Sequence, residues 1–157
     1  MIAPRHFERR FLTAENEISR IGTGQIGGKA QGLIGVADLI AGRFSDREAT
    51  GITAAIPRMT VIATDFFDEF LRLNQLQGTV LADLPDDRIA AAFQRGDLPP
   101  QLVGDLRALA EEVCTPLAVR SSSLLEDALS APFAGVYGTK MIPNNQPSAD
   151  QRFAKLT

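Results

Sequence analysis

The sequence predicts a single α+β domain in which several helices pack against a small sheet. Three short apolar runs, at 56–63, 117–119 and 139–142, have the length and the neighbouring Pro or Gly residues that are typical of strands. The segments between them carry apolar residues three and four positions apart, which is the spacing of helices with one buried face. With 157 residues, 45% of them hydrophobic, the chain is long enough to bury one core.

The first part of the chain is predicted to be helical before the first strand. Residues 1–20 mix charged and apolar side chains, which indicates a short amphipathic helix followed by a connector. A second helix is predicted over about 29–42, with a glycine as its C-cap. Its predicted buried face consists of Leu33, Val36, Ala37 and Ile40. Gly32 and Gly35 weaken this helix, which close packing or the approach of a ligand would explain. The polar residues 43–55 predict an exposed loop.

The middle of the chain predicts a strand at 56–63 and then a largely helical stretch. Thr64 is the predicted N-cap of the helix that follows the strand. The side chains of this helix that are expected in the core are Phe66, Phe67, Phe70, Leu71 and Leu73. Residues 84–115 are interpreted as a helical insertion that contains helices at about 86–95 and 100–113.

The C-terminal residues predict one more helix. Ser148-Ala-Asp-Gln151 has the spacing of a capping box, so the helix is expected to begin at this serine. The sequence stops at Thr157, barely two turns later, and a helix of that length is marginal without neighbours. We therefore expect that the chain is cut inside an element after residue 157.

The composition excludes several classes of function. A formal net charge of −3 gives no general field that attracts nucleic acid, and no apolar run is long enough to cross a bilayer. The N-terminal residues lack a secretory pattern, so we expect a cytoplasmic protein that binds neither nucleic acid nor membrane. Cys114, the single cysteine, lies in an apolar stretch and is expected to be a buried thiol. The single histidine, His6, is expected on the surface, so no metal site built on imidazole is expected.

A glycine-rich segment precedes the helix predicted to begin at Lys29. Four of the eight residues from Ile21 to Gly28 are glycines. A loop of this kind at a helix N-terminus presents backbone amides and the positive end of the helix dipole, and a lysine there adds a charge for phosphate. An ordinary loop with a surface lysine is the alternative interpretation. The segment is not a Walker A motif, because Ala30 follows Lys29 where that motif requires Ser or Thr.

A second segment concentrates polar groups after the apolar run 117–119. Arg120 ends this run, and three serines follow directly at 121–123. A guanidinium beside hydroxyl groups and amides is suited to binding phosphate oxygens. The alternative is a short helix capped by the spacing Ser123-Leu-Leu-Glu126. Further along, two glycines three residues apart, the first being Gly135, permit either close approach to a ligand or a hairpin turn.

Together these two segments resemble the nucleotide-binding domain of the phosphoenolpyruvate synthase and pyruvate phosphate dikinase family. The residues that carry the resemblance are Gly27-Gly28-Lys29, Ala118-Val-Arg-Ser-Ser122, Glu126-Asp127, and Phe133-Ala-Gly135 followed by Thr139. Rifampin phosphotransferase and the starch-phosphorylating dikinases are similar in the second segment. The resemblance implies the N-terminal subdomain of an ATP-grasp fold, an α+β arrangement with a small mixed or antiparallel sheet, of which this sequence contains only the first part.

The resemblance also implies roles for four residues. Lys29 and Arg120 match the lysine and the arginine that contact the phosphates of ATP, so they are the candidate catalytic and ATP-binding residues. Gly135 and Thr139 match residues of the loop that covers the phosphates. In the family, ATP phosphorylates a histidine on a separate domain. The implied partners are therefore ATP, a phosphohistidine domain, and the second half of the ATP-grasp unit, which is expected to supply the ligands of Mg²⁺.

Two departures from the family pattern leave other functions open. The chain has Pro57-Arg-Met-Thr60 where family members usually have Pro-x-Gly-Phe, and Val136 stands in place of a common glutamine. The alternatives are a module that senses a nucleotide without transferring phosphate, and a protein-interaction module derived from the same fold. A homodimer formed through the apolar face that the second half would cover is a further hypothesis.

Overall fold

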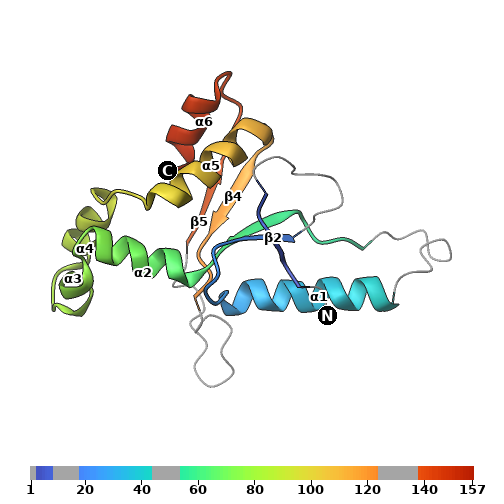
Figure 1. The fold of residues 1–157 in the computed structure, drawn as a ribbon, viewed down its shortest axis with the longest axis horizontal. Helices are drawn as coiled ribbons and strands as arrows, with labels where there is room; N and C mark the ends of the chain where they lie inside the picture. The colour runs from blue at the N-terminus through green and yellow to red at the C-terminus, as the bar shows by residue number, and fades with distance from the viewer. Residues whose placement is uncertain (1–2, 9–17, 44–53, 124–137) are drawn as a thin grey trace.

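The computed structural model describes residues 3–8, 18–43, 54–123 and 138–157, which form a mixed α/β structure with two small sheets (Figure 1). Among these residues, the strands are β1 (Arg5–His6), β2 (Ile18–Ile21), β3 (Met59–Ile62), β4 (Leu117–Arg120) and β5 (Thr139–Ile142). The helices are α1 (Gly28–Arg43), α2 (Thr64–Leu73), α3 (Gln77–Leu81), α4 (Asp86–Gln94), α5 (Pro100–Glu112) and α6 (Ala149–Leu156). Most of the predicted loop at 43–55 lies outside the described residues.

Strands β1, β2 and β3 form a parallel sheet in that order. Strand β2 pairs with β3 along its whole length, with Ile18 opposite Met59. The helix predicted at the start of the chain is wrong for the residues that the structure describes there, because Arg5–His6 is the edge strand β1. Phe7 continues this edge: its backbone N–H donates to the carbonyl oxygen of Arg20 at 2.8 Å, and its ring is buried.

The parallel sheet is the middle of three layers, with α1 on one side and α5 on the other (Figure 1). On the α1 side, Ile18 packs against Ile34 and Ala37. On the α5 side, Ile21 is fully buried. The other buried members of its cluster are Phe7, Phe66, Leu102, Leu106, Ala108 and Leu109. Ile18 and Ile21 thus face opposite sides of the sheet. This is expected because successive side chains of a strand point to alternate faces.

Helix α1 confirms the predicted helix and part of its predicted buried face. Ala37 is buried against the sheet as predicted and Ile34 is buried beside it, whereas Val36, predicted to be buried, is 44% exposed. Leu33 and Ile40 are half-buried. Apolar residues of α1 occupy more than one face of the helix, so the sequence alone does not determine which of them are buried. The position of β2 determines which residues are covered.

The glycines within α1 have open space around them. A Cβ built on Gly32, Gly35 or Gly42 meets no described atom within 4 Å beyond its own helical surroundings. Neither close packing nor approach by another described part of the chain therefore explains Gly32 and Gly35. The helix also continues through Gly42 to Arg43, so this glycine is not the predicted C-cap.

Replacing Gly32 or Gly35 by Ala is expected to raise the free energy of unfolding by about 1 kcal/mol each. Both positions lie inside a helix and are exposed, so the substitution restricts the unfolded chain without a steric cost in the folded protein. Urea denaturation of the two variants measures the effect. A loss of stability at either position would show that a neighbouring group does approach this side of α1.

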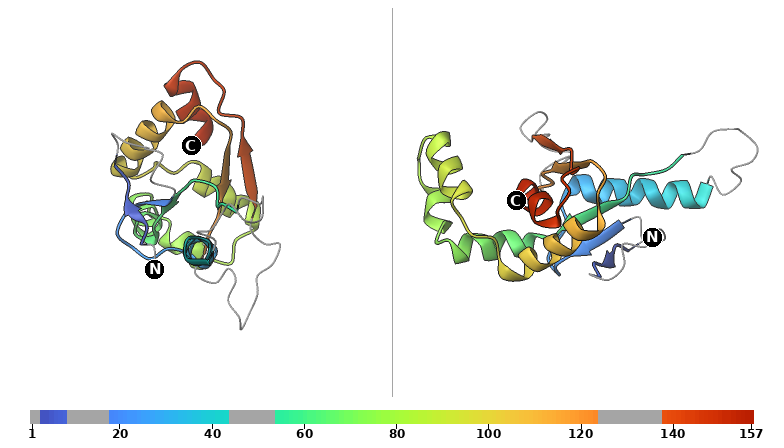
Figure 2. Two further views of the ribbon diagram at one scale, coloured as in Figure 1. Left: turned by 90° about the vertical axis from the view of Figure 1, so that its right-hand side faces the viewer. Right: turned by 90° about the horizontal axis from the view of Figure 1, so that it is seen from above.

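Helices α2, α3 and α4 extend to one side of the molecule as an arm (Figure 2). Phe66 is buried as predicted, but Phe67 and Leu73 are 53% and 42% exposed. The Phe67 ring stacks instead on Phe93 of α4, with 6.4 Å between the ring centroids. The aromatic cluster therefore divides between the core and the arm. Helices α4 and α5 lie within residues 84–115, whose interpretation as an insertion stays a prediction.

Strands β4 and β5 form a separate antiparallel hairpin sheet, so the described strands make one parallel and one antiparallel sheet and not a single mixed one. At one end, Leu117 lies opposite Ile142 and both contact the core. Towards the other end, Val119 and Met141 are 40% and 67% exposed. The two predicted strands are confirmed, and residues 118–120 of β4 are exposed.

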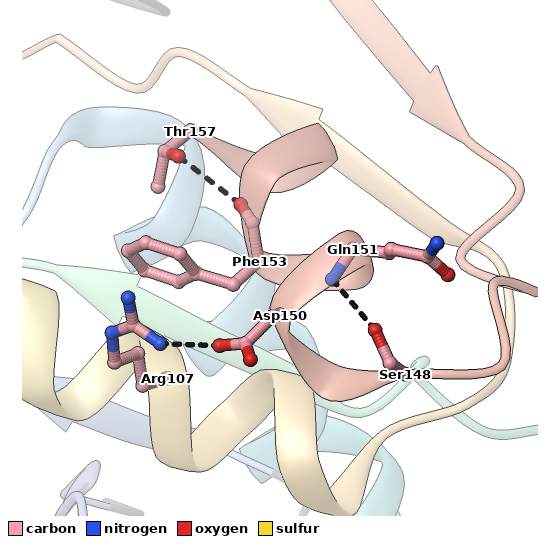
Figure 3. A network of polar contacts seen from close by, with 6 residues as sticks. All are labelled: Arg107, Ser148, Asp150, Gln151, Phe153 and Thr157. Atoms are coloured by element: carbon pink, nitrogen blue, oxygen red, sulfur yellow. Dashed lines mark hydrogen bonds and ion pairs between the residues drawn. The ribbon is translucent and has the colours of Figure 1, made fainter.

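The C-terminal helix α6 confirms the predicted cap and packs on α5 (Figure 3). The Oγ of Ser148 accepts a hydrogen bond from the backbone N–H of Gln151 at 3.2 Å. The guanidinium of Arg107, on α5, lies 4.4 Å from the centroid of the Phe153 ring. Its Nη1 is 2.7 Å from Oδ1 of Asp150. These contacts join the outward-facing sides of the two helices.

Two expectations concerned single residues. His6 is exposed, as predicted. Cys114 is also exposed, so the prediction of a buried thiol is wrong. The cysteine lies in the connection between α5 and β4, and the apolar residues on either side of it face the core without covering it. Among the helices of the described part, none is long and apolar enough to cross a bilayer.

Candidate functional site

Three segments that are distant in the sequence meet at one end of the parallel sheet (Figure 1). Residues 22–27, the glycine segment, follow β2, and Ala63 follows β3. Residues 121–123, the serine segment, follow β4. Because the carboxyl ends of parallel strands lie at the same edge of a sheet, the first two segments are neighbours. The N-termini of α1 and α2 begin at this edge.

Reciprocal hydrogen bonds join the glycine segment to the start of α2. The backbone N–H of Gln25 donates to Oγ1 of Thr64 at 3.1 Å, and the backbone N–H of Thr64 donates to the Gln25 carbonyl at 2.9 Å. The N-cap of α2 is Ala63, not the predicted Thr64. The hydroxyl that was expected to cap its own helix accepts from the glycine segment instead.

The carboxylate of Asp65 forms a second link to the glycine segment. Its Oδ2 accepts hydrogen bonds from the backbone N–H of Thr23 at 2.8 Å and from the Thr23 hydroxyl at 3.1 Å. Burial by itself raises the pKa of Asp65, but the hydrogen bonds from the Thr23 backbone and hydroxyl, together with the nearby backbone amides, outweigh it and leave the pKa below its ordinary value. The carboxylate is therefore ionised at neutral pH.

The serine segment lies directly against the N-terminus of α1. The backbone N–H of Gly28 donates to the Ser123 carbonyl at 2.9 Å, and that of Ala30 donates to Oγ of Ser122 at 3.2 Å. A Cβ on Gly27 would overlap the carbonyl group of Ser122, so this position accommodates only glycine without a shift of backbone. The two segments that stand out in the sequence are thus in contact across 92 residues.

These contacts change the expected chemistry of the α1 N-terminus. The sequence indicated backbone amides open to a phosphate group, but the amides of Gly28 and Ala30 are paired with the serine segment. Ser122 satisfies one of the amides that a helix leaves without internal partners, from a distant part of the chain. Two of the amides that the sequence predicted to be open to a phosphate group are therefore occupied by contacts within the chain.

Three of the four candidate residues lie on segments that the structure brings together. Lys29 is in the first turn of α1, between the two residues that bond to the serine segment, and is half-buried. Arg120 is the exposed last residue of β4, directly before the serine segment. Thr139 is exposed and lies opposite Arg120 in the hairpin. Gly135 lies outside the described residues.

The hairpin register places one more exposed side chain on the face that carries two of the candidate residues. Met141 lies two positions after Thr139, so it shares a face of the hairpin with Thr139 and Arg120. Its side chain is 67% exposed. The strand pattern of Thr139, Lys140 and Met141 predicts that Thr139 and Met141 share a face. The sequence does not show that Arg120 lies on this face, because that depends on which strand pairs with β5.

The described residues offer no metal centre. No group of three or more His, Cys, Asp or Glu side chains in this part of the chain is arranged to hold a metal ion. Glu126 and Asp127, the acidic pair of the second motif, lie outside the described residues. The described residues therefore do not provide the set of oxygen ligands that binds Mg²⁺ in proteins.

A lysine in the first turn of a helix that follows a parallel strand is typical of domains that bind phosphate-bearing ligands, and an arginine on a neighbouring segment supplies a second cation. The family model of the pyruvate phosphate dikinase AMP/ATP-binding domain matches residues 23–157. The chain belongs to this family and is an ATP-binding portion of a pyruvate phosphate dikinase-like protein. Comparisons with curated proteins and with solved structures found no match.

Proposed function

We propose that the chain is the N-terminal subdomain of an ATP-grasp unit and holds the phosphates of ATP for transfer to a histidine on a separate domain. The observation that carries the proposal is the contact between the serine segment and the start of α1. Lys29 lies between the two α1 residues that make this contact, and Arg120 directly precedes the serine segment. Two cationic residues that are far apart in the sequence therefore lie next to the residues that form this contact.

The chemistry of these side chains suits phosphoryl transfer. Lys29 supplies a compact charge, and Arg120 supplies several donors in a plane that match phosphate oxygens. The Thr139 hydroxyl and the Gly135 backbone belong, in this proposal, to the loop that covers the phosphates. The imidazole nitrogen forms its bond to phosphorus as the bond to the leaving oxygen breaks, and the nucleotide product keeps that electron pair. The protein mainly places charge where negative charge develops.

The exposed face of the hairpin completes the proposed nucleotide site. Met141 offers an apolar surface for the adenine base on the face that carries Arg120 and Thr139. The proposal includes two partners, the second half of the ATP-grasp unit with the ligands of Mg²⁺ and a phosphohistidine domain. The match to the AMP/ATP-binding domain of pyruvate phosphate dikinase supports this part of the proposal.

Lys29→Ala and Arg120→Ala are each expected to weaken ATP binding by about 1.5 to 3 kcal/mol, or roughly 10- to 150-fold. Each substitution removes a charge-assisted hydrogen bond to phosphate and leaves the backbone contact between the serine segment and α1 in place. Titration calorimetry of the purified protein with ATP in the presence of magnesium measures the dissociation constants.

Lys155→Ala and Arg88→Ala are the matched controls. Both residues are exposed, and they lie on α6 and α4, away from the N-terminus of α1 (Figure 1). Their removal is expected to change the affinity by less than about twofold, because salt screens charges at that separation. Equal losses in all four variants, or a wild-type protein that does not bind ATP, would contradict the proposed site.

A nucleotide-sensing module that binds ATP without transferring phosphate is the second candidate. It is favoured by the pairing of the Gly28 and Ala30 amides, because this pairing removes two donors from the phosphate site. Incubation of the protein together with its phosphohistidine domain and ATP radiolabelled at each phosphate in turn separates the two functions. Acid-labile label on protein histidine supports transfer, whereas intact ATP binding without protein label supports sensing.

A further inference from the structure

Asp65 lies where the first turn of α2 meets the glycine segment. Its Oδ2 accepts two hydrogen bonds from one residue, the backbone N–H of Thr23 at 2.8 Å and the Thr23 hydroxyl at 3.1 Å. The preceding residue, Thr64, exchanges two further hydrogen bonds with Gln25. Four hydrogen bonds thus hold Thr23 and Gln25 of the glycine segment against the start of α2.

The backbone of the glycine segment is shaped around the same carboxylate. Gly22 has a φ of +93°, which an L side chain rarely adopts, and a Cβ there would lie 2.5 Å from Oδ1 of Asp65. A Cβ on Gly24 would lie 2.6 Å from the backbone nitrogen of Asp65 and 2.9 Å from Oγ1 of Thr64. Both glycines are therefore required by the close approach to α2 and not by an open loop.

We propose that Asp65 is a positioning residue for nucleotide binding: it fixes the glycine segment against α2 and thereby fixes the start of α1, which carries Lys29. The inference rests on the proposed function of Lys29. Residues 22–27 join β2 to α1 without secondary structure of their own, so contacts from outside must define their path. Without Asp65 the segment samples more conformations, and binding must then order it at a cost in affinity.

A purely structural role for Asp65 predicts a different pattern. An acidic residue in the first turn also stabilises its own helix through the dipole, and that effect needs the charge but not the contact with Thr23. Asp65→Asn keeps an oxygen that can accept from Thr23 and removes the charge, whereas Asp65→Ala removes both. Asp68→Ala removes an exposed acid one turn later on the same helix and serves as the control.

Hydrogen exchange and ATP affinity together test the inference. In the protein without nucleotide, Asp65→Ala is expected to speed exchange of the amides of residues 22–27 about tenfold, with no change in the core amides of residues 102–110. It is expected to raise the ATP dissociation constant about tenfold, and Asp65→Asn to recover most of that loss. Asp68→Ala is expected to change neither quantity.

The outcomes separate this inference from the proposed function. If Lys29→Ala weakens ATP binding and Asp65→Ala does not, the inference is overturned while the proposed site stands. It is overturned as well if the exchange of residues 22–27 is unaffected, or if Asp65→Asn is as defective as Asp65→Ala. A wild-type protein that fails to bind ATP removes the proposed function, and the positioning role falls with it even where the exchange rates change.

Discussion

Gly27→Ala is expected to lower the free energy of unfolding by about 3 kcal/mol. The added Cβ overlaps the carbonyl group of Ser122, and backbone atoms cannot turn aside as the end of a flexible side chain can. The serine segment must move away from α1, which breaks the hydrogen bonds donated by Gly28 and Ala30. Urea denaturation measures the loss, and an unchanged unfolding midpoint would show that the two segments are not in contact.

Gly32→Ala is the control for this prediction because it makes the same chemical change five residues later, where a Cβ meets open space. Helix propensity alone would make both substitutions stabilising or nearly neutral. Opposite signs at Gly27 and Gly32 are expected only if the serine segment covers the start of α1 and leaves its later turns free. Gly27→Ala should also weaken ATP binding, since it separates the segments that carry Lys29 and Arg120.

The elements that the sequence predicted well are those whose signals are local. Helix α5 carries Leu102, Leu106 and Leu109 in phase, and all three are buried. Ser148 caps α6 at the predicted position because its partner lies only three residues away. For the same reason the strand around Val61 could be read from a short apolar run after a proline.

The elements that were missed depend on pairing between distant residues. Strand β1 consists of two polar residues, Arg5–His6, and exists because β2 offers it a parallel edge. The exposure of Cys114 and Val119 likewise depends on which neighbours reach them. Composition predicts burial on average, but it cannot predict that a hairpin extends beyond the core at one end.

The candidate site divides in the same way. Lys29 and Arg120 were found through short motifs that resemble a known family. The family model confirms that the chain belongs to this family, but the roles of these two residues stay a prediction. The pairing of Ser122 with Ala30 could not be predicted, because a serine 92 residues away has no fixed spacing to the helix it caps. Thr64 was expected to cap α2, but the proximity of Gln25 gave its hydroxyl another partner.

Arg152→Met is expected to lower the free energy of unfolding by about 3 kcal/mol. The Arg152 side chain is 7% exposed. Its guanidinium donates to the carbonyl oxygens of Ala110 at 2.9 Å, Glu111 at 3.5 Å, Gln146 at 2.7 Å and Pro147 at 3.3 Å. The first two carbonyls belong to the last turn of α5, where they have no helical partners and where the helix dipole favours a positive charge. Methionine fills part of the space but leaves these acceptors unpaired.

Arg107→Met is the matched control, because it replaces an arginine that also joins α5 to α6, but at the surface. The Arg107 side chain is 50% exposed and its ion-pair partner Asp150 is 85% exposed, so the expected loss is about 1 kcal/mol or less. Thermal unfolding should place the midpoint of Arg152→Met roughly 6 to 12 °C below the wild type. Equal losses for the two variants would mean that surface contacts, and not the buried guanidinium at the end of α5, hold the C-terminal helix in place.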